Sequence, residues 1–580
     1  MDMVNVKVNG IAVSVPKGST ILEAAHAAGV EIPTLCYLKD MNEIGACRIC
    51  VVEATGARGL VTACVYPVAE GMEIQTNTDK VRAARKTTLE LILSTHEKKC
   101  LSCVRSTNCE LQKLCLDYGV EDNGKYDGFH PEYALDESAP HMIRDNNKCI
   151  LCRRCVAACQ QQFVSVIGAN DRGIDTHIAC AFEKPLGDVP CVSCGQCINV
   201  CPTGALREKD NTAEVFEALS DPDKIVLVQT APAVRAAIGE EFGLPIGTPC
   251  EGKMVAALRR LGFDKVFDTD FGADMTIVEE ATELVDRVKN GGVLPMITSC
   301  SPGWVKFAEL YYPDQLANLS TYKSPQQMFG ALLKTYYAEK NGIDPRNIVS
   351  VSVMPCTAKK FELTREDEDA AGMPDVDISI TTRELARMIR RAGLNFTALP
   401  DEEFDMPLGA DTGAAVIFGA TGGVMEAALR TANDVLTGKD NGSVDFTEVR
   451  GMEGLKEATY NIAGLEVKVA VASGLTAANH VMSMIKDGTA PWTFVEIMCC
   501  PGGCINGGGQ PIVPAVVRNF ENYRAKRAKV LYDMDRDMPL RKSHQNPMVV
   551  EIYKDYFESF GSHKAHEVLH THYTARKKFR

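Results

Sequence analysis

The fold of the middle of the chain is decided by two cysteine rows, CILCRRCVAAC at residues 149–159 and CVSCGQCINVCP at residues 191–202. Both rows have the C-x2-C-x2-C-x3-C spacing with which thiolates bind 4Fe-4S clusters, and the fourth cysteine of each row then binds the other cluster. This crossing predicts two 4Fe-4S sites within residues 140–209. The first site contains Cys149, Cys152, Cys155 and Cys201, and the second contains Cys191, Cys194, Cys197 and Cys159. Zinc sites have no comparable duplicated row that ends in Cys-Pro.

The other cysteines separate a thiol-rich front of the chain from a thiol-poor back. Of the 23 cysteines, 17 lie between Cys36 and Cys201, and the 379 residues that follow contain six. The opening MDMVNVKVNG has no basic region followed by an apolar one and no twin-arginine motif, so we expect a cytoplasmic protein. Thiols stay reduced in that compartment, and these are too sparse for a small disulfide scaffold. Metal binding is the better explanation of their spacing.

Length and composition indicate a globular protein of several domains. At 580 residues the chain exceeds what one hydrophobic core usually holds, and its contents of 45% hydrophobic and 24% charged residues are ordinary for globular proteins. No apolar run reaches the roughly 18 residues of a membrane span. The net charge of −14 lacks the basic character that binds phosphate backbones. We therefore expect neither a nucleic-acid partner nor a membrane span.

Residues 1–80 predict a small β-rich domain with a metal site. Alternating segments at 4–8 and 11–15 flank Asn9-Gly10, a dipeptide suited to a type I′ hairpin, and Ser19-Thr20 precedes a helical stretch over 21–28. The thiols of this domain have C-x10-C-x2-C-x13-C spacing and are Cys36, Cys47, Cys50 and Cys64. Four thiolates fit either zinc or iron. The arrangement resembles the plant-type 2Fe-2S ferredoxin domain at the front of complex I and hydrogenase subunits, which implies a β-grasp fold and one 2Fe-2S cluster.

Residues 81–125 contain a second, shorter metal motif. After a helical stretch over 80–94, the pattern H-x3-C-x2-C-x5-C is formed by His96, Cys100, Cys103 and Cys109. The residue types alone are compatible with a Cys3His zinc site. The spacing is similar to that of the histidine-ligated 4Fe-4S site in complex I and the larger hydrogenases, which implies a third accessory 4Fe-4S cluster. Cys115 falls outside the motif, and we expect it to be a packing residue.

From residue 210 onward the pattern is that of an α/β protein. Apolar runs typical of buried strands, at 225–228, 293–297, 348–353 and 494–497, alternate with helical segments such as 273–288 and 324–340. We predict a two-lobed α/β domain over 210–519, with 520–580 wrapping around it. The late cysteines that follow these strands are Cys300, Cys356, Cys500 and Cys504. Because ligands gather at the carboxyl ends of parallel strands, these thiols should converge on one site.

Three signatures around these cysteines resemble those of iron-iron hydrogenases. They are TSCSPGW at 298–304, MPCTAKKFE at 354–362, and EIMCCPGGC at 496–504 followed by GGG at 507–509. The similarity extends over essentially the whole chain, and the front modules resemble those of the clostridial type with four accessory clusters or of the catalytic subunit of NAD-linked, electron-bifurcating complexes. The resemblance implies reversible reduction of protons to hydrogen at an H-cluster. This cofactor is a 4Fe-4S cubane joined by one cysteine to a diiron unit with carbon monoxide, cyanide and azadithiolate ligands.

The same resemblance implies roles for individual residues. Cys356, Cys500 and Cys504 would bind the cubane, with Cys504 bridging to the diiron unit. Lys359 would hydrogen-bond a cyanide, and Met354 and Met498 would pack around the diiron unit. A proton relay would run outward from the azadithiolate through Cys300, Glu280, Ser320, Glu283 and Arg287. Positions 280, 283 and 287 share one helix face, a spacing that alone fits a solvated charge stripe equally well.

The first signature departs from the family pattern, which has two adjacent cysteines before the proline. Here Ser301 stands at the second of these two positions, so the motif does not identify the fourth ligand of the cubane. Ser301 could bind through its oxygen, Cys300 could shift to bind iron, or H-cluster retention could be impaired. A neutral hydroxyl is a weak iron ligand compared with a thiolate, which favours a local adjustment that involves Cys300 or Cys499.

The accessory clusters predict an electron wire, and we expect their order in space to follow their order in the chain. No GxGxxG fingerprint followed by an acidic residue occurs, so any NAD chemistry requires another subunit. The expected redox partners are ferredoxin, or NADH/flavin-binding and additional iron-sulfur subunits of a bifurcating complex. Two other classes share parts of the pattern. An NADH-dehydrogenase-type electron-transfer subunit would not need the late signatures, and a non-catalytic assembly or hydrogen-sensing relative is left open by Ser301.

Overall fold

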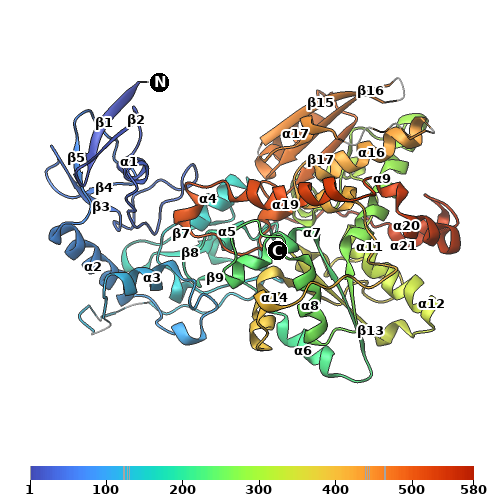
Figure 1. Cartoon of the computed structure of the whole chain (residues 1–580), viewed down its shortest axis with the longest axis horizontal. Coiled ribbons are helices and arrows are strands. Elements are labelled where there is room, and N and C mark those ends of the chain that lie inside the picture. The colour runs from blue at the N-terminus through green and yellow to red at the C-terminus, as the bar shows by residue number, and fades with distance from the viewer. Residues whose placement is uncertain are drawn as a thin grey trace.

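The computed structural model describes residues 2–579 except 122, 123, 127, 130, 438, 441, 443, 444, 453, 463 and 464. Figure 1 shows an elongated molecule with a small sheet domain at one end and a large α/β region at the other. The helices α2 (Asp79–Ser94) and α3 (Glu110–Asp117) lie beneath the small domain. The duplicated cysteine rows lie between these ends. The predicted segment limits at residues 1 and 580 fall outside the described residues, and the internal boundaries stay predictions.

The N-terminal domain is a five-stranded sheet in the order β2-β1-β5-β3-β4. A hairpin joins β1 (Met3–Val8) to β2 (Ile11–Pro16), and β5 (Glu73–Gln75) pairs in parallel with β1. Asn9 and Gly10 have φ values of 49° and 84°, as a type I′ turn requires. The remaining strands are β3 (Val51–Ala54) and β4 (Val61–Thr62).

Helix α1 (Ile21–Ala27) packs against this sheet. Thr20 caps the helix, because its hydroxyl accepts from Glu23 N while the Glu23 carboxylate accepts from Thr20 N. The apolar side of α1 buries Ile21 and Leu22 in the core of the domain. Both the hairpin and the capped helix that the sequence predicts are therefore confirmed.

The middle of the chain contains two small antiparallel ladders. One pairs β6 (Met142–Arg144) with β9 (Leu206–Glu208), and the other pairs β7 (Ile167–Asn170) with β8 (His177–Cys180). Each cysteine row runs into a short helix, α4 (Arg154–Gln161) or α5 (Gln196–Asn199). Arg153 and Gly195 precede these helices at matching positions, and both are left-handed, with φ of 61° and 69°. The duplicated sequence thus folds as a duplicated loop and helix.

The back of the chain has two lobes, each built on a four-stranded sheet. The first sheet is parallel throughout and contains, in order, β11 (Lys265–Asp268), β10 (Ile225–Thr230), β13 (Ile348–Met354) and β14 (Ile378–Thr381). The second contains, in order, β12 (Met296–Ile297), β17 (Phe494–Met498), β16 (Leu465–Ser473) and β15 (Gly454–Ile462), of which only the β15–β16 pair is antiparallel. The predicted two-lobed α/β architecture is confirmed.

Long helices fill the space between the two sheets. They are α9 (Thr269–Asn290), α11 (Pro325–Leu332) and α16 (Gly423–Thr437). Helix α9 starts directly from β11, where the Asp268 carboxylate caps it by accepting from Asp270 N at 3.1 Å. The predicted helix over 324–340 continues from α11 through a π-helical turn, Leu333–Tyr337, into α12 (Ala338–Asn341). The predicted strand over 293–297 is shorter than expected, because Pro295 has no N–H to donate and Val293 and Leu294 are exposed.

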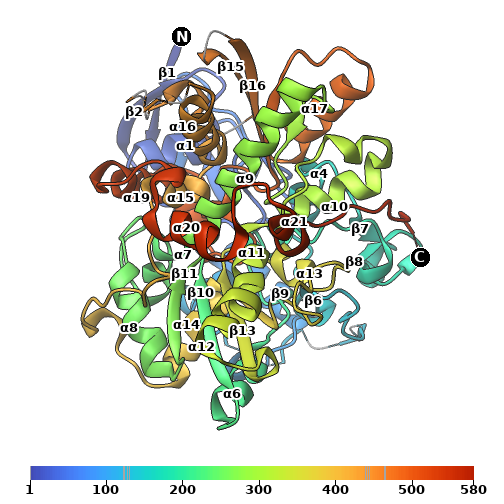
Figure 2. The ribbon, with the colours of Figure 1, turned by 90° about the vertical axis from the view of Figure 1, so that its right-hand side faces the viewer.

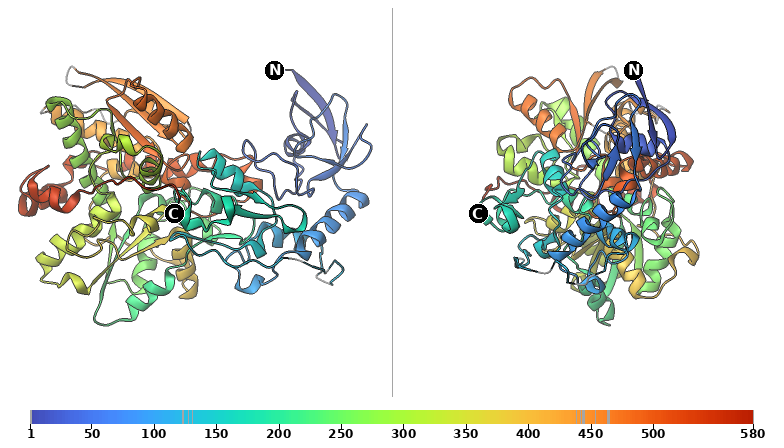
Figure 3. Two further views of the ribbon diagram at one scale, coloured as in Figure 1. Left: turned by 180° about the vertical axis from the view of Figure 1, so that it is seen from behind. Right: turned by 90° about the vertical axis from the view of Figure 1, so that its left-hand side faces the viewer.

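The helices of the C-terminal segment pack on the surface of the back domain. Figures 2 and 3 show α19 (Tyr523–Asp537), α20 (Pro547–Ile552) and α21 (His563–Leu569) on the surface of the two-lobed domain. Arg430 of α16 donates to Asp535 of α19 at 2.9 Å, and both side chains are buried. In the described part of the chain, no helix combines the length and the apolar character that crossing a membrane requires.

Candidate active site

A cavity lies between the two lobes, at the carboxyl ends of their parallel strands. Most of its lining is apolar, with a small group of thiols. The cysteines that line it are Cys194, Cys300, Cys356, Cys499, Cys500 and Cys504. Cys356 follows β13 and Cys500 follows β17, as the sequence predicts. Residues from three separate signatures therefore meet in one place.

Glycines allow the loop that carries Cys504 to reach this cavity. Gly502 and Gly503 have φ values of 91° and 93°, a region that strongly favours glycine. A Cβ atom on Gly503 would lie 2.6 Å from Thr421 N, and one on Gly507 would lie 2.1 Å from the carbonyl oxygen of Pro355. The Gly-rich signature is thus explained by close backbone packing around the cavity.

Lys359 on α13 (Ala358–Glu362) supplies the ammonium group of the cavity. Its Nζ donates to Ser324 Oγ at 2.7 Å and to the carbonyl oxygen of Cys300 at 3.3 Å, and it pairs with Glu362 at 2.9 Å. Met354 and Met498 also line the cavity. Glu362 belongs to the second signature, and no role for it follows from the sequence. In the structure it orients Lys359 and accepts from Ser324 and Gln326.

Glu280 lies on α9, between the cavity and the surface. It is 2% exposed and hydrogen-bonds to Ser320. Burial raises the pKa of Glu280 to about 8, although the hydrogen bond with Ser320 opposes this shift. Cys300 lies on the cavity side of Glu280, close enough for the two groups to interact electrostatically.

Glu283 and Arg287, one and two turns further along α9, continue this line outward. Arg287 Nε donates to Glu283 Oε1 at 2.9 Å, and both side chains are partly exposed. Glu283 Oε2 accepts from both the backbone N–H and the hydroxyl of Thr321 at 3.1 Å. Thr321 was not predicted as a member of the line. Its only sequence signal is its place next to Ser320.

Glu496 was quoted as part of the third signature but was given no role. It is fully buried on β17, and its carboxylate accepts from the backbone N–H groups of Gly422 and Met425 at 2.6 and 2.8 Å. Burial raises the pKa of Glu496 to about 7 against these hydrogen bonds. Glu496 therefore fixes the start of α16 against β17.

Two smaller cavities bring together the two predicted sets of the duplicated rows. One is lined by Cys149, Cys152, Cys155 and Cys201. The other is lined by Cys159, Cys191, Cys194 and Cys197. The grouping is the crossed one expected for two 4Fe-4S clusters. Cys194 lines both the second of these cavities and the large cavity between the lobes.

The thiols of the N-terminal domain form two close pairs. The Sγ atoms of Cys50 and Cys64 are 3.3 Å apart, and Cys36 and Cys47 hydrogen-bond to each other. Two pairs of thiols fit a 2Fe-2S cluster, in which each iron takes two cysteines. The loop that carries Cys36 also touches the first site of the duplicated rows, because Asn42 Nδ2 donates to the carbonyl oxygens of both Cys36 and Cys152.

The predicted His96 site also contacts the first site of the duplicated rows, that of Cys149. Cys109 Sγ donates to the carbonyl oxygen of Pro202 at 3.6 Å, and Arg105 donates to that of Cys201 at 2.8 Å. His96 Nδ1 is buried with no hydrogen-bond partner among the described residues, as expected of a ring nitrogen that would bind a metal. Both front sites thus adjoin the Cys149 site. Cys47 of the N-terminal site and Cys109 of the His96 site also pack against one apolar cluster, so the three sites adjoin one another.

Comparisons with known proteins agree with this arrangement. Residues 224–508 match the family of the iron only hydrogenase large subunit, C-terminal domain. The chain is 50% identical to the NADP-reducing hydrogenase subunit HndD of Solidesulfovibrio fructosivorans, and the alignment covers 100% of both chains.

The chain belongs to the iron-iron (FeFe) hydrogenase family.

This FeFe hydrogenase matches further families along its length. Residues 1–79 match a 2Fe-2S iron-sulfur cluster binding domain, 85–123 the iron-sulfur binding region of NADH-ubiquinone oxidoreductase-G, and 148–205 a 4Fe-4S dicluster domain. Residues 521–576 match the iron hydrogenase small subunit. The chain therefore has 2Fe-2S and 4Fe-4S binding domains as well as an H-cluster domain. A pure electron-transfer subunit of the NADH-dehydrogenase type would lack the last of these.

Two other relatives extend the comparison. This FeFe hydrogenase is 44% identical to iron hydrogenase 1 of Clostridium pasteurianum, with 98% of this chain and 100% of that protein covered. Its fold is similar to the solved structure of apo FeFe-hydrogenase HydA1 from Chlamydomonas reinhardtii, with a TM-score of 0.56 and 41% identity over 64% of this chain and 100% of that one. The chain is accordingly an enzyme of the hydrogenase type.

Proposed function

We propose that this FeFe hydrogenase reduces protons to hydrogen, and reoxidises hydrogen, in the cavity between its two lobes. The observation that carries the proposal is the convergence of three distant signatures on that cavity, with Cys356, Cys500 and Cys504 beside Lys359. A thiol-lined, mostly apolar cavity fits an iron-sulfur cofactor, because thiolates bind iron and the apolar walls exclude water. When bound, the H-cluster supplies the bond-forming chemistry, and the protein supplies ligands, orientation and protons.

Six residues of the cavity have a task that their contacts support. Cys356, Cys500 and Cys504 would hold the cubane. The ammonium group of Lys359, steadied by Ser324 and Glu362, offers a donor to an anionic ligand inside the cavity. Met354 and Met498 provide polarizable apolar walls without competing hydrogen bonds.

Protons travel along α9 between the cavity and the surface. Cys300 and Glu280 lie at the inner end, and burial raises the pKa of the Cys300 thiol well above its ordinary value, so that it remains protonated at neutral pH. Because the pKa of Glu280 is about 8, this carboxyl is able to gain and lose a proton near neutral pH, as a relay group must. Ser320, Glu283 and Arg287 complete the relay, with Thr321 holding Glu283.

Electrons reach the cavity through the accessory sites, for which we propose one 2Fe-2S and three 4Fe-4S clusters. The Cys149 and Cys159 sites form the common path, and Cys194 lies where that path meets the cavity. The N-terminal site and the His96 site are two entrances, since each adjoins the Cys149 site. Two entrances suit a chain that exchanges electrons with more than one partner.

We further propose that this chain works in the cytoplasm as one subunit of a complex that reduces a pyridine nucleotide. The name of HndD describes that protein as a subunit of an NADP-reducing hydrogenase, and HndD aligns with the whole of this chain. The partners would be an NADH/flavin-binding subunit, additional iron-sulfur subunits, and ferredoxin.

This assignment of partners can be tested by measuring which electron acceptors the matured chain reduces under hydrogen. We expect it to reduce methyl viologen and ferredoxin but to reduce NAD or NADP only after a flavin-bearing subunit is added. Cys50→Ala, which removes a thiol of the N-terminal site, should lower nucleotide reduction in the complex by at least tenfold and leave methyl viologen reduction unchanged. Cys115→Ala is the matched control. Nucleotide reduction by the isolated chain, or an unaffected Cys50→Ala complex, would contradict the proposal.

A further inference from the structure

The cavity contains one thiol, that of Cys499, to which the functional account above gives no task. Cys499 is 3% exposed and lines the cavity beside Cys500, immediately after β17. Its thiol hydrogen-bonds to Cys500 on one side and to Cys194 on the other. Cys499 therefore lies on the side of the cavity that faces the Cys159 site.

Ser301 lies on this same side of the cavity. It stands at the N-cap position of α10 (Pro302–Tyr311) without capping the helix through its side chain, and its Oγ accepts instead from the backbone N–H of Cys499 at 3.2 Å. The thiol of Cys499 lies over the first turn of α10, because a Cβ atom on Gly303 would be 2.7 Å from Cys499 Sγ. The Cys499 thiol therefore lies next to Ser301, the position at which the first signature has a hydroxyl instead of a thiol.

Cys300 has a different set of neighbours. It packs against the apolar group that includes Met498 and Phe418, and its titratable neighbours are Glu280, Cys504, Lys359 and Glu496. Its contact with Glu280 belongs to the proton relay. Binding of iron by Cys300 would take its thiol out of that relay, whereas Cys499 already hydrogen-bonds to the ligand Cys500.

We propose that Cys499 is the fourth cysteine ligand of the cubane, together with Cys356, Cys500 and Cys504, and that Ser301 is a positioning residue for Cys499. This inference rests on the proposed H-cluster site. A thiolate binds iron far better than a neutral hydroxyl does. On binding, the Cys499 thiol releases its proton to solvent and forms one sulfur–iron bond, with no change of oxidation state. The Ser301 hydroxyl holds the Cys499 backbone through its N–H, and Gly303 leaves the space that the thiol occupies.

Iron and sulfide content, with Mössbauer and electron paramagnetic resonance spectra of the anaerobically reconstituted full chain, test the assignment. Cys499→Ala should lose about four irons per chain, and its spectral difference from the natural protein should match that of Cys356→Ala. Ser301→Ala and Cys300→Ala should each retain this iron. Cys250→Ala, which removes a buried cysteine that lines none of the cluster cavities, is the control. The double variant Cys499→Ala with Ser301→Cys should regain the iron.

A gentler variant guards against simple misfolding. Gly303 lies within α10 with ordinary helical geometry, so Gly303→Ala suits the backbone but crowds the Cys499 thiol. We expect it to weaken retention of the same iron and to leave the other clusters intact.

Full retention of the iron by Cys499→Ala would overturn the proposal, and so would its loss from Ser301→Ala or Cys300→Ala, which would make that residue the ligand. The hydrogenase assignment fails separately, through absence of carbon monoxide and cyanide infrared bands from the matured natural protein.

Discussion

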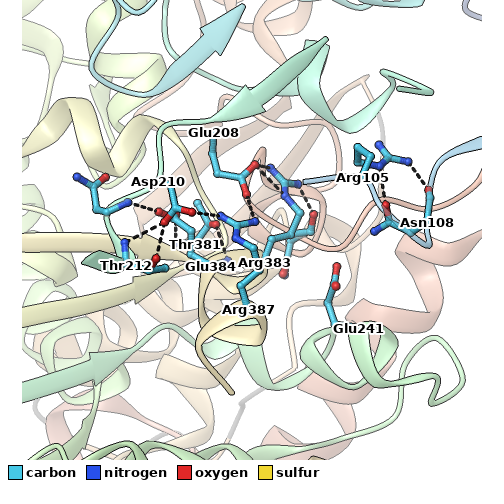
Figure 4. Close-up of polar contacts among 12 residues, drawn as sticks. Arg105, Asn108, Glu208, Asp210, Thr212, Glu241, Thr381, Arg383, Glu384 and Arg387 are labelled. Carbon is cyan, nitrogen blue, oxygen red and sulfur yellow. Dashed lines mark hydrogen bonds and ion pairs between the residues drawn. The ribbon is translucent and has the colours of Figure 1, made fainter. Parts of the chain in front are cut away.

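Glu208 on β9 accepts hydrogen bonds from Arg383 on α14 (Thr382–Arg391), at 2.8 Å from Nη2 and 3.1 Å from Nε. Figure 4 shows that Arg387 approaches the same carboxylate, and its Nη1 lies 2.7 Å from Glu208 Oε1. The Glu208 side chain is 4% exposed. This buried cluster joins the duplicated-row domain to the first lobe, near the path that connects the accessory sites to the cavity.

Glu208→Gln should destabilise this junction, because it leaves the buried guanidinium of Arg383 without its counter-charge and leaves Arg387 with only Asp210, at 3.6 Å. Breaking a buried pair typically costs about 3–5 kcal/mol. The apparent midpoint of thermal unfolding should fall clearly, whereas Glu73→Gln, at the exposed pair with Lys7, should change stability by less than about 0.5 kcal/mol. Equal midpoints for the two variants would contradict this prediction.

The same carboxylate predicts acid sensitivity. Burial alone would favour the protonated form, but Arg383 and Arg387 hold the pKa of Glu208 below its usual range. A lowered folded-state pKa gives stability that is present above the unfolded value of about 4.3 and is lost as the pH falls below it. We expect the midpoint of the natural protein to drop below about pH 4.3 more steeply than that of Glu208→Gln. If the midpoints of the two proteins fell in parallel as the pH is lowered, Glu208 would not be the cause of the loss of stability in acid.

Glu280→Gln should lower hydrogen evolution by at least about a hundredfold, because an amide cannot relay a proton. Iron content and infrared bands should remain those of the natural protein. The adjacent Glu279 provides a matched control, since it is also buried on α9 but accepts from the backbone N–H of Gly561. Glu279→Gln should retain most activity. Comparable activity losses in the two variants would remove the special role of Glu280.

The raised pKa of Glu280 has a consequence for stability at higher pH. Between about pH 4.3 and the folded-state pKa of about 8, the folded protein binds this proton more tightly than the unfolded chain does, so stability falls as pH rises through this window. Glu280→Gln has no such proton. Its thermal midpoint should therefore decline less between pH 5 and pH 8, measured by calorimetry. A decline equal to that of the natural protein would contradict the assigned shift.

His96→Ala should remove the cluster of the second module, with a loss of about four irons per chain. Because the N-terminal site provides a separate entrance, hydrogen evolution from reduced methyl viologen should fall by less than about twofold. Cys115→Ala, in the same module, should keep its iron. Unchanged iron in His96→Ala would show that histidine is not a ligand.

Much of the fold could be predicted because its signals are local. The Asn9-Gly10 turn, the Thr20 cap and the duplicated cysteine rows each depend on residues a few positions apart, and all have the expected structure. The strand before Cys300 was predicted too long because Pro295 interrupts an apolar run. Strands β11, β14, β15 and β16 were not predicted, since tertiary pairing decides them as much as sequence does.

The active site was predicted through motifs, and its gaps arise where a role depends on distant contacts. Thr321 holds Glu283 across a gap of 38 residues, a contact that leaves no pattern in the sequence. Asn42 likewise reaches Cys152 across 110 residues. Such contacts require the folded chain. Glu362 is different, because it lies three residues from Lys359 in one helix, a spacing visible in the sequence to which no role was assigned.

The most direct test of the central claim is hydrogen evolution from reduced methyl viologen by the anaerobically matured protein, recorded together with infrared spectra of the carbon monoxide and cyanide stretching region. We predict hydrogen production and both sets of bands. Iron-sulfur absorbance with neither bands nor hydrogen would contradict an H-cluster in the cavity between the lobes.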